Sequence, residues 1–439
     1  MRIQSLSLEN FRLAGEQPLR IDFSSEHNVT ILLGDNGFGK TSVLDAISYT
    51  LSPYLSQFPF ATSRNPSDFD LHVDDQGKIC PYLSISAEFM SHDNQILKVT
   101  RTRKGMEAAP KSNVEDLRKL GQTMKDNIVD HEDVSLPVFA YYGTGRGQIK
   151  APERKRGFQQ SFERWDCYHN ALLPSTDFKS FFAWYDLMED EERRKREELR
   201  DFNYKLPALQ AVRQALTNFV GDSYSNPRIE IHPLRFVMTE LGEDGTHRDL
   251  RIEQLSDGYK IVIAMVADIA SRMVEANPES QHPLESSGII LVDEIDLHLH
   301  PLWQLKIVSQ LVKTFPNVQF VLTTHSPVIV AGAASISQIV KLNGRSQQNI
   351  EDTNPELDTM DIGQILLSNY FGLPSLRSPK WYDKLNRRME LLSRSNLSAS
   401  EAQELEKLNK ELSVLQVGQT PNEIKASQLL NKIAQALDV

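Results

Sequence analysis

The segment 34–41 carries the strongest chemical signal in the chain. It matches the pattern G-x-x-x-x-G-K-[ST] at every fixed position, and it lies between an apolar run at 29–33 and a helix-like run that starts at Ser42. A glycine-rich bend between a strand and a helix directs several backbone N–H groups into one concavity, where the helix N-terminus adds positive potential. The pattern predicts a phosphate cradle in which Lys40 reaches the β- and γ-phosphates of ATP and Thr41 binds Mg²⁺. The other predicted nucleotide contacts are Asn36, Gly37, Gly39 and Ser42.

Two acidic residues follow a second apolar run, at 288–292. Such a run predicts a buried parallel strand that delivers carboxylates at its C-terminal edge. We expect Asp293 to hold Mg²⁺, and Glu294 to act as the general base that accepts the proton of the attacking water. The alternative is an ordinary strand end with acidic capping residues.

The segment Leu255-Ser256-Asp257-Gly258 opens a third motif, which we call the signature segment. Ser256, Gly258 and the first N–H groups of the following helix predict a second anion site, although Ser-Asp-Gly alone is a common helix cap. One γ-phosphate does not need two phosphate-binding sites, the P-loop and the signature segment, on the same chain. We therefore expect Ser256 to serve a nucleotide bound to a second copy, which implies a homo-oligomer, either a dimer or a multiple of dimers.

Four further residues have functional and structural interpretations. His325 follows the apolar run 318–323, and we expect it to sense the γ-phosphate, whereas a histidine after a strand is usually structural. Arg12 is expected to reach the nucleotide phosphates or to be a plain surface arginine. His298 and His300 are expected to orient loops or to face a second copy rather than to bind a metal.

Composition limits the class of protein. The chain has 439 residues and a net charge of −11, which argues against a surface covered with basic residues for nucleic acid. The two cysteines, Cys80 and Cys167, give no disulfide framework or zinc cluster, so a reducing cytoplasm is expected. No apolar stretch approaches the length of a membrane span.

The pattern of apolar residues predicts an α/β fold: a mixed or parallel sheet with flanking helices, an antiparallel β subdomain, an inserted helical subdomain and a helical tail. Residues 103–133 show no clear period, and Pro53 interrupts the pattern of the first helix. The charge-dense helix 189–200 is expected to be a solvated face. Predicted strands are 1–8, 29–33, 82–89, 96–100, 136–142, 229–238, 250–252, 288–293, 318–323 and 337–342, and the later helices are 258–275 and 301–314.

Four parts of the chain are expected. Residues 1–154 form the N-terminal part of the ATPase head with the P-loop, and 155–224 form the inserted helical subdomain. Residues 225–345 complete the head with the signature segment, the two acids and His325. Residues 346–439 are a helical tail for assembly or partner docking, in which Leu405, Leu408, Leu412 and Leu415 form an apolar stripe that packs on another tail helix or on a partner.

Taken in order, these motifs resemble the ABC-type ATPase heads of the RecF, Rad50 and SMC group. The Asp257 variant of the signature and the run Asp293-Glu294-Ile295-Asp296-Leu297-His298-Leu299-His300-Pro301 resemble the AAA15 or OLD-like branch. The run 137–146 and the segment Phe371-Gly372-Leu373-Pro374-Ser375 are similar to the PtuA family of Septu and some retron anti-phage systems. Residues 42–254 hold no sustained heptads, so the long coiled-coil arms of Rad50 and SMC proteins are not expected.

The resemblance implies a slow Mg²⁺-dependent ATPase that dimerises on nucleotide and regulates a partner effector, typically an HNH-type nuclease, through which DNA is contacted. No acidic cluster or zinc fold of a nuclease is evident in this chain itself. The alternative is a RecF-like ATPase that binds DNA directly, with a basic groove built from Arg101, Arg103, Lys104, Lys150, Arg154, Lys155 and Arg156.

Lys40→Ala is predicted to abolish nucleotide binding, because it removes the only mobile cation in the expected cradle. Binding of labelled ATP measures this directly. Affinity within twofold of the wild-type protein would contradict the assignment of segment 34–41 as a P-loop.

Overall fold

The computed structural model describes residues 1–105, 110–147, 163–175, 178–221, 224–231, 234–242, 245–343, 350–351, 356–394, 397–413 and 415. The chain divides into two compact units, Met1–Ile365 and Leu366–Val439, which are described separately below. Within the described residues, no helix combines the length and the apolar character that crossing a membrane requires.

A six-stranded sheet forms the centre of the first unit, with the strand order β13-β12-β3-β11-β10-β6. All neighbouring pairs are parallel except β12 and β13. Every residue of β3, β6, β10 and β11 is buried, which explains why these segments are nearly continuous apolar runs. The strands are β3 (Val29–Leu33), β6 (Val138–Tyr142), β10 (Gly288–Val292), β11 (Val318–Thr323), β12 (Gln338–Lys341) and β13 (Ile350–Glu351). The first five are confirmed with small changes at their ends, whereas β13 lies in the segment 346–439, which we expected to be helical, and pairs with β12.

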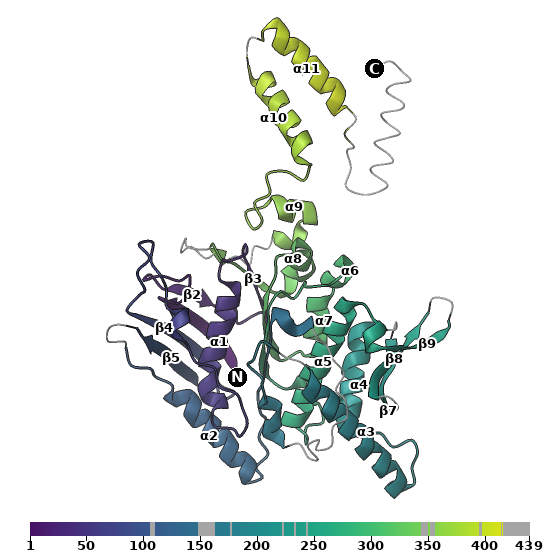
Figure 1. Ribbon diagram of the computed structural model, residues 1–439. Helices are drawn as coiled ribbons and strands as arrows, with labels where there is room; N and C mark the ends of the chain where they lie inside the picture. The colour runs from purple at the N-terminus through teal and green to yellow at the C-terminus, as the bar shows by residue number, and fades with distance from the viewer. Residues whose placement is uncertain are drawn as a thin grey trace. The chain divides into compact units, whose positions relative to one another are not determined.

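A second, antiparallel sheet has the order β2-β1-β4-β5. Its strands are β1 (Arg2–Glu9), β2 (Leu19–Asp22), β4 (Tyr82–Met90) and β5 (Ile96–Lys104). The predicted pairing of 82–89 with 96–100 is confirmed, and each strand extends further. Figure 1 shows helix α1 (Lys40–Leu55) and helix α2 (Glu115–Val129) beside this sheet.

Two details of these helices differ from the prediction. Helix α1 continues past Pro53 to Leu55, because a proline so near the helix end leaves few backbone bonds to lose. Helix α2 lies in the region 103–133, where we expected no regular element. Only Leu117 and Gly121 of α2 are buried, so its apolar face is too narrow to give a clear period in the sequence.

A third sheet, with the order β7-β8-β9, precedes the signature segment. The predicted hairpin around the glycine-rich turn is confirmed, as β8 (Leu234–Leu241) paired with β9 (His247–Arg251). The expected single strand 229–238 is wrong, because it is divided between β8 and a further strand, β7 (Tyr224–Ile231), which pairs with β8. The remaining helices of this unit are α3 (Lys179–Leu199), α4 (Pro207–Val220), α5 (Asp257–Ala276), α6 (Pro301–Gln304), α7 (Ile307–Thr314) and α8 (Pro327–Ala333), so the predicted helix 301–314 is divided in two.

The charge-dense part of α3 is not the solvated face that we expected. Glu189 and Glu192 are 8% and 2% exposed, and both carboxylates form ion pairs with Arg213 of α4. Burial raises the pKa of Glu189, although the Ile229 N–H and the Arg213 guanidinium both favour its charged form. Charged residues of α3 therefore form part of the contact between α3 and α4.

Helices α10 (Pro379–Ser393) and α11 (Ala399–Leu412) pack together in the second unit. Their common core is Leu391, Leu408 and Leu412, against which Leu405 and Leu415 also pack. We expected the stripe to pack either on another tail helix or on a partner, and in the structure it packs on another tail helix, α10. Helix α9 (Ile362–Leu367) lies at the boundary of the two units, and residues 416–439 lie outside the described part.

Arg213→Met is predicted to lower the free energy of unfolding by about 3 kcal/mol, because it leaves the buried carboxylate of Glu189 without its ion pair and leaves Glu192 with Arg196 alone. Urea denaturation followed by circular dichroism measures this. The matched control is Lys195→Met on α3, because the ion pair of Lys195 with Glu198 is exposed on both sides, and no measurable change is expected for it. Equal stabilities of the two variants would contradict the interpretation that ion pairs with Arg213 stabilise the contact between α3 and α4.

Candidate functional site

The candidate site lies where β3, β11 and β10 end. These three strands are adjacent and parallel, so their carboxyl ends meet at one edge of the sheet. The P-loop follows β3, His325 follows β11, and Asp293 and Glu294 follow β10. Residues that are 252 and 285 positions apart in the chain are therefore neighbours by topology alone.

The P-loop has the backbone that its glycines predict. Gly37 and Gly39 have φ of 83° and 90°, values that residues with side chains rarely adopt, and Gly39 caps the first turn of α1. A Cβ atom at Gly37 would meet no atom within 4 Å, so the loop is open on that side. Asn36 is exposed beside it. The loop thus has room for a phosphate chain next to the N-terminus of a 16-residue helix.

Lys40 and His325 are in direct contact. The Lys40 ammonium donates to Nε2 of His325 at 2.7 Å and to the backbone oxygen of Gly34 at 2.7 Å. His325 therefore accepts at Nε2, which places the proton of a neutral ring on Nδ1. Burial lowers the pKa of Lys40, and the carboxylates of Asp293 and Glu294 oppose that shift. The structure brings this predicted pair together, with the cation directed at the edge of the sheet.

Both carboxylate oxygens of Asp293 accept hydrogen bonds from hydroxyl groups. Thr41 Oγ1 donates to Oδ2 at 2.8 Å, and Thr323 Oγ1 donates to Oδ1 at 2.7 Å. The side chain of Asp293 is thereby fixed beside the first helical turn after the P-loop. A hydroxyl and a carboxylate are the oxygen donors that Mg²⁺ prefers, and Mg²⁺ usually takes only one or two protein ligands besides water and phosphate. This donor set fits a Mg²⁺–nucleotide complex.

Glu294 has a left-handed backbone with φ of 49°. Its N–H donates to Thr323 Oγ1 at 2.7 Å, and its carbonyl oxygen accepts from Arg146 Nη2 at 2.6 Å. For a residue with a Cβ atom this conformation costs about 1–2 kcal/mol, so it persists because the neighbouring groups hold it. The conformation turns the chain sharply after β10 and sets the direction of the Glu294 carboxylate.

Arg146 was not singled out by the sequence as a site residue. It follows β6, the strand next to β10, and it is 1% exposed. Its guanidinium donates to the backbone oxygens of Gly143, Asp293 and Glu294. The signals in the sequence were its place after an apolar strand in the Gly-rich run 143–147 and at the end of the run 137–146, and neither reveals a contact with another strand end.

The signature segment lies apart from this cluster. Ser256 is exposed at the N-cap of α5, and Gly258 is buried against the loop at 298–299. A Cβ atom at position 258 would lie 2.4 Å from the backbone oxygen of His298, so only glycine fits there. Ser256 and Gly258 line a hollow of about 610 Å³ whose other walls include His298, His300, Tyr259 and Trp303, and no P-loop residue lines it.

His298 and His300 take structural places in the described chain. His298 has φ of 64° and presents its backbone oxygen to Gly258, and His300 Nδ1 accepts from the Leu302 N–H at the start of α6. Among the described residues, no group of three or more histidine, cysteine or acidic side chains is arranged to hold a metal ion.

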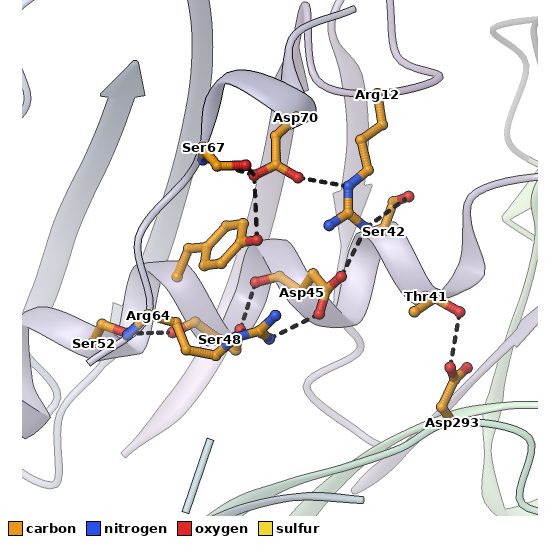
Figure 2. A network of polar contacts seen from close by, with 11 residues as sticks. Arg12, Thr41, Ser42, Asp45, Ser48, Ser52, Arg64, Ser67, Asp70 and Asp293 are labelled. Carbon is orange, nitrogen blue, oxygen red and sulfur yellow. Dashed lines mark hydrogen bonds and ion pairs between the residues drawn. The ribbon is translucent and has the colours of Figure 1, made fainter. Parts of the chain in front are cut away.

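Arg12 belongs to a polar network along α1 (Figure 2). Its Nε donates to Asp70 at 2.8 Å, and its Nη1 donates to Asp45 at 2.7 Å and to Ser42 at 3.4 Å. Arg64 binds the second oxygen of Asp45. Two acidic residues therefore hold Arg12 next to Ser42, and its predicted contact with phosphate stays a prediction.

The basic residues considered for direct DNA binding are partly engaged. The guanidinium of Arg103 forms an ion pair with Asp68 at 2.8 Å, and that of Arg101 donates to Asn65. Lys104 is exposed. The four predicted basic residues from Lys150 to Arg156 lie outside the described residues.

Comparison with known proteins gives consistent matches. A family model described as an AAA domain matches residues 5–222, and another described as "AAA domain, putative AbiEii toxin, Type IV TA system" matches 116–331. The retron Ec83 probable ATPase of Escherichia coli is 30% identical over 384 residues, which cover 75% of this chain and 69% of that protein. The retron Vc95 probable ATPase of Vibrio cholerae serotype O1 biovar El Tor is 27% identical, with coverage of 81% and 76%.

The Septu protein PtuA of Bacillus mycoides is 25% identical, and the match covers 96% of this chain but 52% of that protein. Among solved structures, the SMC head bound to the C-winged helix domain of ScpA is similar with a TM-score of 0.48 and 16% identity, over 80% of this chain and 97% of that one.

Thr323→Val is predicted to slow ATP turnover about tenfold with little effect on ATP binding. The hydroxyl that it removes both donates to Asp293 and accepts from the Glu294 N–H, and a buried group left unpaired costs about 1–3 kcal/mol. Each 1.4 kcal/mol of lost transition-state stabilisation is about tenfold in rate.

The matched control is Thr314→Val, which removes a buried hydroxyl that bonds only within the last turn of α7. Its turnover should equal that of the wild-type protein. A Thr323→Val protein with unchanged kcat would show that the hydroxyl is not needed to hold the two acids.

Proposed function

Because this chain belongs to the family of AAA-domain ATPases that includes the retron Ec83 probable ATPase, we propose that it is a slow, Mg²⁺-dependent ATPase that acts as a nucleotide-controlled switch. The observation that carries this proposal is the meeting of Lys40, His325, Thr41 and Asp293 at the edge of three parallel strands. This edge supplies a cation, a neutral hydrogen-bonding ring and two oxygen ligands within a few ångströms.

Each side chain of this edge has a distinct task in the proposal. Lys40 is held by backbone oxygens of its own loop and by His325, and it would exchange these acceptors for phosphate oxygens. Thr41 and Asp293 would hold Mg²⁺, which neutralises negative charge on the transferred phosphoryl group. His325, released from Lys40, would hydrogen-bond to the γ-phosphate.

Glu294 is proposed to accept the proton of the attacking water. Its carboxylate follows the strand that delivers Asp293, so it lies at the same edge as the phosphate cradle. A carboxylate in this position contributes a factor of about 10²–10⁴ as a general base. An amide of the same shape cannot accept the proton.

Dimerisation is proposed from the separation of the signature segment and the P-loop. Ser256 is exposed at the N-terminus of α5, beside a hollow that no P-loop residue lines. A second copy that presents its Ser256 to the nucleotide on this chain would complete the site. Nucleotide that binds the closed dimer better than the open chain favours closure, and hydrolysis reverses it.

The biological setting is proposed from the names of the relatives. These are retron ATPases and the Septu protein PtuA, and we infer that this chain acts in the same kind of anti-phage system. Its closed state would control a partner effector, an HNH-type nuclease that contacts DNA, with residues 346–439 as the docking or assembly segment. The RecF-like alternative gains no support from the described basic residues, since Arg103 is paired with Asp68.

Glu294→Gln is predicted to keep ATP binding and to reduce hydrolysis by at least about 10²-fold, because the proton acceptor is lost. It should also trap the dimer, which light scattering after chromatography detects as a doubled mass in the presence of ATP and Mg²⁺. Undiminished hydrolysis would transfer the base role to another residue, with His325 the next candidate.

A mixing experiment tests the shared site. Lys40→Ala and Ser256→Arg chains should each be inactive alone, and their mixture should regain activity, because one of the two sites of the mixed dimer combines an intact Lys40 with an intact Ser256. Normal hydrolysis by Ser256→Arg alone would overturn the shared site but not the ATPase assignment.

A further inference from the structure

We propose that Arg146 is a positioning residue for ATP hydrolysis, which fixes the backbone of Asp293 and Glu294 and thereby the direction of the Glu294 carboxylate. The inference rests on the proposed function, since it assigns a task to a residue that does not touch the substrate. It extends that function because none of the nucleotide-binding motifs discussed above gives Arg146 a task.

The contacts of Arg146 all point to the chain after β10. Nη1 donates to the backbone oxygens of Gly143, at 3.0 Å, and of Asp293, and Nη2 donates to that of Glu294 at 2.6 Å. One planar group thus joins the end of β6 to two consecutive peptide units after its neighbour β10. The fixed fork of a guanidinium suits this task, because a lysine ammonium cannot span both oxygens in the same way.

The position is costly for an arginine, which indicates a specific role. Arg146 is 1% exposed, and its Nε–H is buried with no hydrogen-bond partner among the described residues. Burial lowers the pKa of Arg146 to about 10, while the carboxylates of Asp293, Asp296 and Glu294 oppose the shift. The side chain therefore stays charged at neutral pH and adds positive potential beneath the acidic edge.

Removal of Arg146 should disturb Glu294 more than Asp293. Its left-handed backbone is held from two sides, by Thr323 at its N–H and by Arg146 at its carbonyl. Loss of one side lets φ relax towards ordinary values and turns the carboxylate away from its direction. Asp293 is less dependent, because its own side chain keeps both hydroxyl partners, from Thr41 and Thr323.

This difference predicts an effect on turnover rather than on binding. Arg146→Ala should lower kcat for ATP about 10–100-fold, the range expected when a catalytic group is displaced by about 1 Å. The Kd for ATP should stay within about threefold, since Lys40, Thr41 and Asp293 are unchanged. Guanidinium chloride at sub-denaturing concentration should restore kcat several-fold in Arg146→Ala by occupying the emptied space.

Three comparisons make the experiment decisive. Arg164→Ala is the matched control, because Arg164 also donates to two backbone oxygens, of Ala276 and Val134, away from the site, and it should keep kcat and show no rescue. Glu294→Gln should be slow and not rescued by guanidinium. Arg146→Lys keeps the charge without the fork, and it should fold and remain slow.

The outcomes separate the inference from the proposed function. A wild-type protein that does not hydrolyse ATP would overturn the function itself. Wild-type kcat in Arg146→Ala or Arg146→Lys, or a slow Arg146→Ala protein that guanidinium does not rescue, would overturn the positioning role. If neither variant folds, or if both lose ATP binding together with hydrolysis, Arg146 serves the fold alone and the inference is wrong.

Discussion

Three buried parallel strands that end at the same edge are the constraint on which the site depends. Because β3, β11 and β10 are adjacent and lie wholly in the core, their registers leave little freedom to the residues that follow them. The cation of Lys40, the ring of His325 and the carboxylate of Asp293 meet as a result of strand order. The short side-chain contacts then refine an arrangement that the backbone already imposes.

The hydroxyl of Thr323 connects these parallel strands to the two acidic residues of the site. It lies on the last residue of β11, donates to Asp293 and accepts from the backbone of Glu294, both of which follow β10. Arg146 makes the corresponding link from β6 on the other side of β10. The acids are thus held from both neighbouring strands, which suits a site that must keep a strained residue in one direction.

Sequence patterns predicted well those elements whose burial gives a clear periodicity or an unbroken run of apolar residues. The strands β3, β10 and β11 are nearly continuous apolar segments followed by motif residues, and the P-loop and its helix were predicted from the same pattern. Helix α2 was missed because only two of its residues are buried, and the hairpin before α5 was counted with one strand too few.

The errors about side chains have a different cause, since they depend on partners distant in sequence. Glu189 and Glu192 read as solvent-facing charges until Arg213 of α4 is placed against them. Arg146 is one basic residue in a glycine-rich run until β10 lies beside β6. For Leu408 and Leu412 the sequence left the choice open between another tail helix and a partner, and Leu391 of α10 is the residue that covers them. A single sequence does not reveal such pairings.

The central place of β3 in the six-stranded sheet has a consequence for folding during synthesis. Its two neighbours, β11 and β12, both come from the C-terminal part of the chain, so β3 leaves the ribosome roughly 290 residues before either partner. At synthesis rates of about 5–20 residues per second, this largely apolar strand waits for about 15–60 s without a hydrogen-bonded neighbour on either side. During that interval the segment Val29–Leu33 has the character of an unprotected edge, open to pairing with other nascent chains. Efficient production of this ATPase therefore depends on whatever shields its first core strand until the last ones arrive.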